Sequence, residues 1–97
     1  MGNIIINDNV FLRQFEVEIG EDLAKIEYAL QDRKIFLTKL IIPNSNADQN
    51  FEETFIKEVF ELIREKNIRI MPTSPEIRKF IKKHKEFKDL LPIGVRL

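Results

Sequence analysis

The sequence predicts a small α/β (α+β) fold in which an antiparallel β-meander is followed by a helix, a parallel strand and a short C-terminal helix. Between Val10 and Ile42, apolar and polar residues alternate, which is typical of half-buried strands. From Phe51 onward, apolar residues recur every three or four positions, which is typical of an amphipathic helix. A chain of 97 residues is long enough for one hydrophobic core, so we expect a single domain over 1–97.

Three strands are expected in the first half of the chain, over 10–19, 23–30 and 34–42. Short turns separate them, and such connections make neighbouring strands antiparallel. Residues 4–7 are expected to add an edge strand, and Pro43 to end the meander, because proline has no N–H for the ladder. The side chains expected to face the core from the first two strands are Phe11, Phe15, Val17, Ile19, Ala24, Ile26, Tyr28 and Leu30.

The first helix is expected from Phe51 to Lys66, with its apolar stripe facing the sheet. Asn50 is a suitable N-cap, and Glu53 completes a capping-box pattern. Asn67 is suited to end the helix in the left-handed conformation.

A short apolar strand over 68–71 should follow the first helix, and the helical crossover makes it parallel to the strand before that helix. Ser74 and Pro75 then mark the start of a second helix, with serine as N-cap and proline in the first turn. This helix is expected to end at His84 and to be followed by a last turn. The inward residues of this part are Ile77, Phe80, Ile81, Phe87, Leu90 and Leu91.

Composition excludes several classes of function. The chain has no cysteine and one histidine, so we expect no disulfide, no thiolate nucleophile and no metal site. The N-terminal segment has no basic run and only three consecutive isoleucines, a pattern that predicts neither a signal peptide nor a membrane span. We therefore expect a cytoplasmic protein without membrane contact.

Charge is unevenly distributed although the total is zero. Residues 1–67 carry 8 Lys or Arg against 13 Asp or Glu, whereas residues 68–97 carry 8 against 3. The basic C-terminal part either meets phosphate groups or forms the solvated face of a helix packed against an acidic body. Nucleic acid is not the expected partner, because no exposed aromatic residues are interleaved with the basic ones.

The strand–loop–helix unit over 34–66 is a candidate anion site. A helix N-terminus presents free N–H groups and a partial positive charge. Here those groups belong to Gln49, Asn50 and Phe51. The crevice between the strands expected at 34–42 and 68–71 is the matching ligand slot.

Three short motifs stand at defined places in this frame. Ile42-Pro43 ends the meander, Pro72-Thr73-Ser74-Pro75 ends the later strand, and the stretch from Phe80 to Leu90 (FIKKHKEFKDL) closes the domain. With these motifs the chain resembles the small single-domain branch of the GNAT acetyl-CoA-dependent N-acetyltransferases. That family has Val-Pro, Pro-x-Cys-Pro and Tyr-Ile-x-x-His-x-Glu-Tyr-x-x-Leu at the same places. The similarity covers residues 9–91 and implies a small GNAT-like fold.

The resemblance implies transfer of an acetyl group from acetyl-CoA to a primary amine. The implied partners are an acyl-CoA and either an amine acceptor or a protein partner. Ser74 stands at the family's cysteine position and is the candidate catalytic residue, although it is also explained as the N-cap of the second helix. His84 is either a general base or the end of that helix. The cofactor-binding residues implied are Leu40, Ile41, Ile42, Gln49, Asn50, Phe51 and Ser74.

The loop before the first helix departs from the family pattern. Where the family has a Gly-x-Gly loop, this chain reads Asp48-Gln49-Asn50-Phe51-Glu52, without a glycine. Asp48, Glu52 and Glu53 bring three carboxylates to the N–H groups of the expected anion site. The alternative function is therefore a catalytically inactive interaction module that keeps the scaffold and has lost affinity for CoA. The sequence leaves the oligomeric state open.

Overall fold

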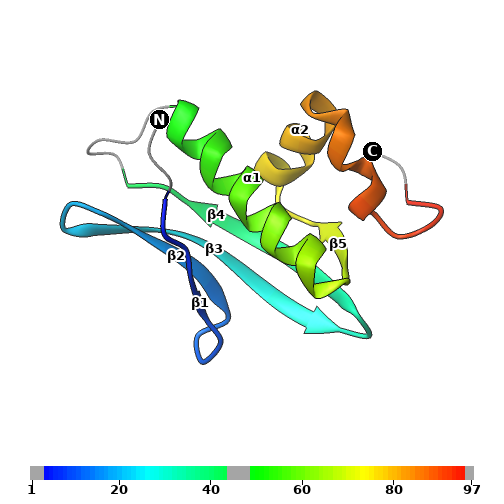
Figure 1. The fold of residues 1–97 in the computed structure, drawn as a ribbon, viewed down its shortest axis with the longest axis horizontal. Coiled ribbons are helices and arrows are strands. Elements are labelled where there is room, and N and C mark those ends of the chain that lie inside the picture. The colour runs from blue at the N-terminus through cyan, green and yellow to red at the C-terminus, as the bar shows by residue number, and fades with distance from the viewer. Residues whose placement is uncertain (1–3, 44–48, 96–97) are drawn as a thin grey trace.

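The sheet contains five strands in chain order (Figure 1). The structure is a computed structural model that describes residues 4–43 and 49–95, apart from the side chain of Gln49. Neighbouring strands from β1 to β4 are antiparallel, and β5 is parallel to β4. The predicted meander and the predicted parallel strand are therefore confirmed. The strands are β1 (Asn7–Asn9), β2 (Gln14–Ile19), β3 (Asp22–Gln31), β4 (Lys34–Ile41) and β5 (Arg69–Pro72).

The helices cover one face of the sheet. Figure 1 shows α1 lying across the strands, with α2 and the short 3₁₀ helix after it beside β5. Phe60 of α1 packs edge-on against Phe80 and Phe87, with ring centroids 5.4 Å and 5.2 Å away. The three segments therefore share one core. The segments are α1 (Gln49–Lys66), α2 (Pro75–Lys83) and η1 (Lys85–Leu90).

The start of α1 differs from the prediction and its end agrees with it. The helix begins at Gln49, so Asn50 lies in its first turn, and the predicted N-cap and the capping box built on it are wrong. Glu53 instead forms an ion pair of 2.8 Å with Lys83 of α2. Asn67 adopts φ 63° and donates its N–H to the carbonyl of Arg64, which confirms the predicted left-handed C-cap.

The start of α2 agrees with the prediction in position, but the Ser74 side chain makes no capping hydrogen bond. Ser74 has the extended backbone of an N-cap, with φ −75° and ψ 132°, and Pro75 follows in the first turn. The helix ends at Lys83 with His84 as C-cap. The residues predicted to face the core from α2 and η1 are all buried, namely Ile77, Phe80, Ile81, Phe87, Leu90 and Leu91.

The first predicted strand is correct only in its second half. Residues 10–13 form the tip of the hairpin between β1 and β2, and Phe11 is 92% exposed instead of buried. The side chain of Asn9 accepts a hydrogen bond of 3.0 Å from the N–H of Leu12. Arg13 then adopts the left-handed φ of 58°, and the chain reverses. The edge strand accordingly lies at Asn7–Asn9, and not over 4–7.

Leu30 also faces solvent, contrary to the prediction, with 53% of its surface exposed. β2 begins at Gln14, which lies opposite Glu27 of β3. The later residues of β3, including Leu30, therefore have no β2 residue beside them. Alternation along a strand predicts a face, but it does not predict how far the neighbouring strand reaches.

Polar side chains hold β1 to β2. Asn7 and Asn9 donate hydrogen bonds of 3.2 Å and 2.9 Å to the carboxylate of Glu16, which also accepts one from Gln14. The hydrogen bond from Gln14, followed by that from Asn9, lowers the pKa of Glu16 below its ordinary value. This ring of donors explains why two polar residues of β2, Gln14 and Glu16, are buried.

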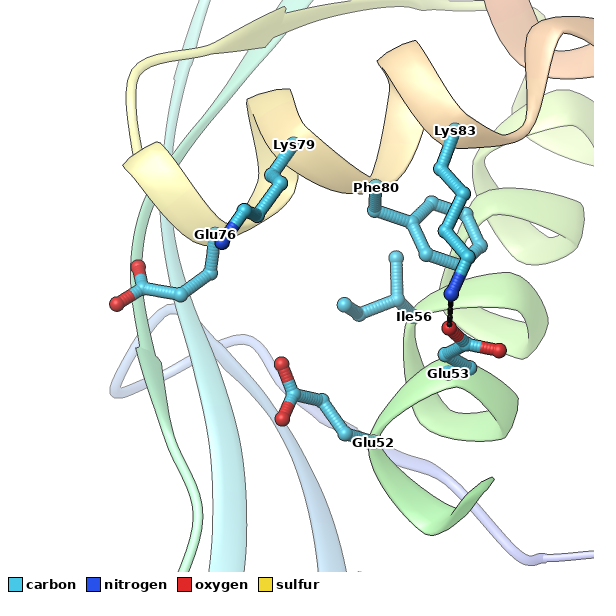
Figure 2. A pocket seen from close by; sticks show the side chains of 7 residues that line it. All are labelled: Glu52, Glu53, Ile56, Glu76, Lys79, Phe80 and Lys83. Carbon is cyan, nitrogen blue, oxygen red and sulfur yellow. Dashed lines mark hydrogen bonds and ion pairs between the residues drawn. The ribbon is translucent and has the colours of Figure 1, made fainter. Parts of the chain in front are cut away.

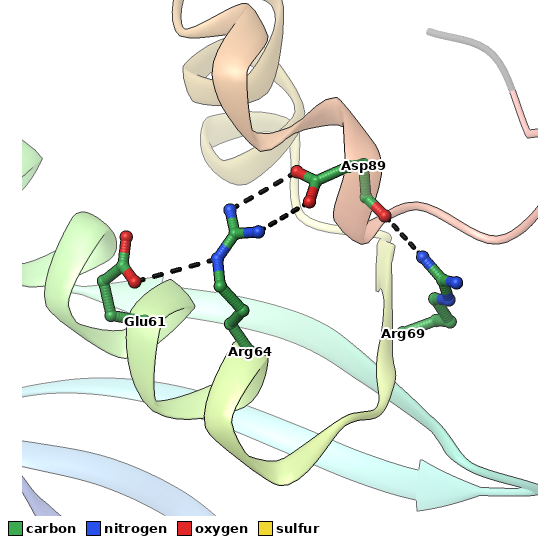
Figure 3. Close-up of polar contacts among 4 residues, drawn as sticks. All are labelled: Glu61, Arg64, Arg69 and Asp89. Carbon is green, nitrogen blue, oxygen red and sulfur yellow. Dashed lines mark hydrogen bonds and ion pairs between the residues drawn. The ribbon is translucent and has the colours of Figure 1, made fainter.

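A second polar cluster fastens η1 to the rest of the domain (Figure 3). The Arg64 guanidinium of α1 donates two hydrogen bonds, of 2.6 Å and 3.3 Å, to the carboxylate of Asp89 in η1. Arg69 of β5 donates to the backbone carbonyl of the same residue. These groups are exposed, so water and salt screen their attraction. Their role is to fix the orientation of η1 over the end of α1.

We expect Phe60→Ala to lower the free energy of unfolding by about 3–5 kcal/mol, because it removes the ring shared by α1, α2 and η1 and leaves a cavity. Urea denaturation measures the effect. The matched control is Phe11→Ala at the exposed hairpin tip, which should change stability by no more than about 0.5 kcal/mol. Equal losses in the two variants would contradict this description of the core.

Candidate active site

β5 leaves β4 halfway along that strand. Their pairing ends at Leu37 opposite Pro72. The Leu37 carbonyl then accepts hydrogen bonds of 3.0 Å from the N–H of Ser74 and of 3.0 Å from the hydroxyl of Thr73. β4 continues to Ile41, paired only with β3. In the part of the chain that the structure describes, backbone groups of this second half that point away from β3 therefore have no strand partner.

A β-bulge lies at the point of separation. Lys39 is opposite Glu27, but Leu37 is opposite Tyr28, so Thr38 is an extra residue in β4. The Thr38 hydroxyl donates a hydrogen bond of 3.2 Å to the carbonyl of Glu27. Bulges bend a strand and redirect its backbone groups, and this one does so where β4 has lost its neighbour.

A cleft of about 290 Å³ lies between the beginning of α1 and α2 (Figure 2). Its floor is apolar and comes from Ile56 and Phe80. Figure 2 shows the Glu52 side chain extending from α1 and the Glu76 side chain from the first turn of α2, with the Glu53–Lys83 ion pair joining the two helices. The full lining is Glu52, Glu53, Ile56, Glu76, Lys79, Phe80 and Lys83.

Ser74 lies between the point where β5 separates from β4 and this cleft. It is 1% exposed, its N–H is bound to Leu37, and its hydroxyl donates a hydrogen bond of 2.8 Å to the carboxylate of Glu76. That hydrogen bond, followed by one from the Glu76 backbone N–H, lowers the pKa of the Glu76 carboxyl. A carboxylate whose pKa is lowered is a weak base. The Ser74–Glu76 pair is therefore better suited to holding a negative charge in place than to activating a nucleophile.

His84 lies at the opposite end of α2 from Ser74, about 14 Å away by the length of the helix. Its N–H donates to the carbonyl of Phe80, and its ring stacks on the Phe80 ring with 4.3 Å between centroids. Its Nε2 lies 3.8 Å from Glu53. These contacts agree with His84 as a helix end, and they put its imidazole out of reach of the Ser74 hydroxyl.

The residues predicted to bind a cofactor lie in two groups. Leu40 and Ile41 belong to the half of β4 that is paired with β3 alone, and Ile42 follows it. Gln49, Asn50 and Phe51, the residues of the candidate anion site, form the first turn of α1. The Phe51 ring packs against the core, 5.9 Å from the Phe55 ring. Asp48 lies outside the described residues.

The bulge was not predicted, although the sequence holds a signal for it. Ile35 and Leu37 face the core in the first half of β4, and Leu40 and Ile42 pack against it in the second half. The inward positions therefore change from odd to even numbers, which requires one extra residue between Leu37 and Leu40. The role of Glu76 in the cleft was also missed, because its contact with Ser74 depends on the cap geometry.

Comparison with known proteins gives the class. Residues 14–90 match the family model of the GCN5-related N-acetyl-transferases, so the chain belongs to this family. The fold is similar to the NMR solution structure of a GCN5-like protein from Staphylococcus aureus described as a candidate N-acetyltransferase. The TM-score is 0.71 at 22% identity, and the match covers 99% of this chain and 94% of that one. No protein with a curated description matches the sequence.

The family resemblance and the fold class predicted from the sequence are thus confirmed. Within the described ranges, no three His, Cys, Asp or Glu side chains are grouped so that they could hold a metal ion. None of the helices described is both long enough and apolar enough to cross a membrane.

We expect Ser74→Ala to raise the pKa of Glu76 toward the ordinary value of 4.5, because the largest cause of its lowering is removed. In the native protein, ionisation of Glu76 stabilises the fold above the unfolded-state value of 4.5. This contribution is lost as the pH falls through the lower folded-state value. The variant should therefore lose less stability than the native protein as the pH falls from about 5 to 3.

An NMR titration of the Glu76 carboxyl carbon measures the change directly. Ser74→Thr keeps a hydroxyl at this position and serves as the control, in which the low pKa should persist. An unchanged Glu76 pKa in Ser74→Ala would show that the hydrogen bond of 2.8 Å does not stabilise the ionised carboxyl.

Proposed function

We propose that the protein is an acetyl-CoA-dependent N-acetyltransferase that acts on a primary amine. Membership of the GCN5-related family supports acetyl transfer as the type of reaction. The observation that carries the proposal is the separation of β5 from β4 at Leu37, which leaves strand backbone available, with Ser74 and Glu76 leading from that point to the cleft. The chain keeps this arrangement although its motif residues differ from the family pattern.

The residues present fit one part of CoA better than the other. The pantetheine arm is an extended chain with two amide groups, and the unpaired backbone groups between Thr38 and Ile41 can pair with such a chain as a strand would. Ile56 and Phe80 offer apolar contacts along the cleft. The phosphates fit poorly in the first turn of α1, where Glu52 has no ion-pair partner among the described residues.

Acetyl-CoA would supply an acetyl thioester, which an uncharged amine attacks directly. What the chain must provide is orientation of the two reactants, N–H donors for the developing oxyanion, and a path for the proton. The bulge at Thr38 lies where β4 has lost its neighbour β5 and is the candidate source of those donors. Glu52 and Glu76 give the cleft a negative potential that attracts a protonated amine.

Ser74 has a positioning role in this proposal. Its backbone N–H fixes the end of β5 to β4, and its hydroxyl fixes Glu76. Direct attack of the amine on the thioester needs no covalent enzyme intermediate, so the absence of an imidazole next to Ser74 is no obstacle.

The second candidate function is the interaction module without CoA affinity. The observation that favours it is the pair of carboxylates, Glu52 and Glu53, on the cleft side of the first turns of α1. An anion approaching this helix end meets like charge before it meets the N–H groups.

Binding of CoA separates the two candidates. We expect millimolar CoA or acetyl-CoA to raise the thermal unfolding midpoint, because a ligand that binds only the folded state stabilises it by RT ln(1 + [L]/Kd). Acetyl transfer from acetyl-CoA to a panel of primary amines should then release free CoA thiol. A chain whose midpoint does not move in millimolar CoA is the interaction module, and the transferase proposal is wrong.

Glu52→Gln should tighten CoA binding about two- to fivefold, because it removes an unpaired negative charge from the cleft. Isothermal titration calorimetry measures the affinity. Glu58→Gln removes the same charge from an exposed position of α1 outside the cleft and should leave the affinity unchanged. Equal tightening in both variants would mean that only net charge matters.

A further inference from the structure

We infer that the phosphates of CoA are held on the outer side of α2, by Arg78, Lys79 and Lys82, and not at the N-terminus of α1. The inference rests on the proposed function, since it concerns the same cofactor. It identifies the cations that would balance the phosphate charges. The start of α1, where the sequence predicts the anion site, carries carboxylates instead.

The first argument is the shape of the surface. A second depression of about 500 Å³ lies along α2, lined by Pro75, Glu76, Arg78, Lys79 and Lys82. It shares Glu76 and Lys79 with the cleft between α1 and α2. The two hollows are therefore adjacent, and a ligand whose pantetheine arm occupies the cleft can extend over α2 without leaving the surface.

The second argument is the distribution of charge on α2. The helix carries four cations and one carboxylate. Lys83 is paired with Glu53, but Arg78, Lys79 and Lys82 take part in no salt bridge with the residues that the structure describes. All three are exposed. The depression also contains the Glu76 carboxylate, so its three cations leave a net charge of +2 for a ligand.

The spacing of these cations adds a third argument. Arg78 and Lys82 are four positions apart, as are Lys79 and Lys83, so each pair stands on the same side of the helix. Like charges at this spacing destabilise a helix. An anion with several negative charges placed beside them removes the repulsion. CoA carries such charges in its 5′-diphosphate and its 3′-phosphate.

The start of α1 carries charge of the opposite sign to the outer side of α2. Its first turns present Glu52 and Glu53 to the cleft, and Glu53 already neutralises Lys83. Across the cleft, potential therefore changes from negative at α1 to positive at the outer side of α2. An amine and a phosphate would be drawn to opposite sides, which keeps the acceptor and the nucleotide apart.

The test compares two variants of the full chain that lose the same charge. Lys79→Gln/Lys82→Gln removes two cations from the proposed phosphate site, and Lys85→Gln/Lys88→Gln removes two exposed cations from η1. Glutamine and lysine have similar helix propensities, so both variants should fold. Calorimetric titrations use CoA, dephospho-CoA and pantetheine as ligands, each at low and at physiological salt.

We expect the α2 variant to bind CoA about tenfold more weakly than the native chain, with a smaller dependence on salt. Its affinity for pantetheine should stay the same, because pantetheine has no phosphate. The η1 variant should bind CoA within about twofold of the native affinity.

Three results would overturn the inference. Equal CoA affinity in the native chain and the α2 variant would mean that the phosphates lie elsewhere, while the transferase proposal stands. No CoA binding to the native chain would remove the transferase proposal and this inference together. Binding of a single-stranded oligonucleotide that is lost in the α2 variant, with CoA affinity unchanged, would assign the basic surface to nucleic acid.

Discussion

The whole site depends on one backbone carbonyl. The Leu37 oxygen accepts the hydroxyl of Thr73 and the N–H of Ser74, and the chain then turns away from the sheet into α2. If β5 continued beside β4, the ladder would be complete and the second half of β4 would have no free backbone groups. The end of β5, the start of α2 and the open part of β4 therefore meet at the same pair of hydrogen bonds.

The charges of the two helices beside the opening are the reverse of what a phosphate site at the start of α1 would need. α1 begins with glutamates, and α2 carries the cations. The Glu53–Lys83 ion pair joins them across the cleft. This pair is partly exposed, so its direct contribution to stability is small. Its larger effect is electrostatic, because it cancels one charge of each sign and leaves Glu52 on one side and Lys79 on the other.

Most features with local causes are predictable from the sequence, and those with distant causes are not; the turn at residues 10–13 is a local feature that the alternation conceals. The left-handed Asn67, the Ser74-Pro75 helix start and the meander follow from neighbouring residues, and the structure has them. Phe11 was assigned to the core because alternation continues through the turn, whereas the turn is set by the Asn9 side chain. The Glu53–Lys83 pair joins residues 30 positions apart, which no local pattern predicts. The sequence predicts where the site residues stand in the fold. Their chemistry depends on contacts between residues far apart in the sequence, which it does not predict.

Because Thr38 is an extra residue in β4, the geometry of the site depends on the number of residues in this strand as well as on its side chains. A strand with one residue fewer between Leu37 and Leu40 could keep every side chain that lines the cleft. Its regular pleat, however, would turn Leu40 and Ile42 away from the core and aim different backbone groups at the opening. Insertions and deletions in β4 are thus a route by which this fold could lose or change an activity while its surface composition stays the same.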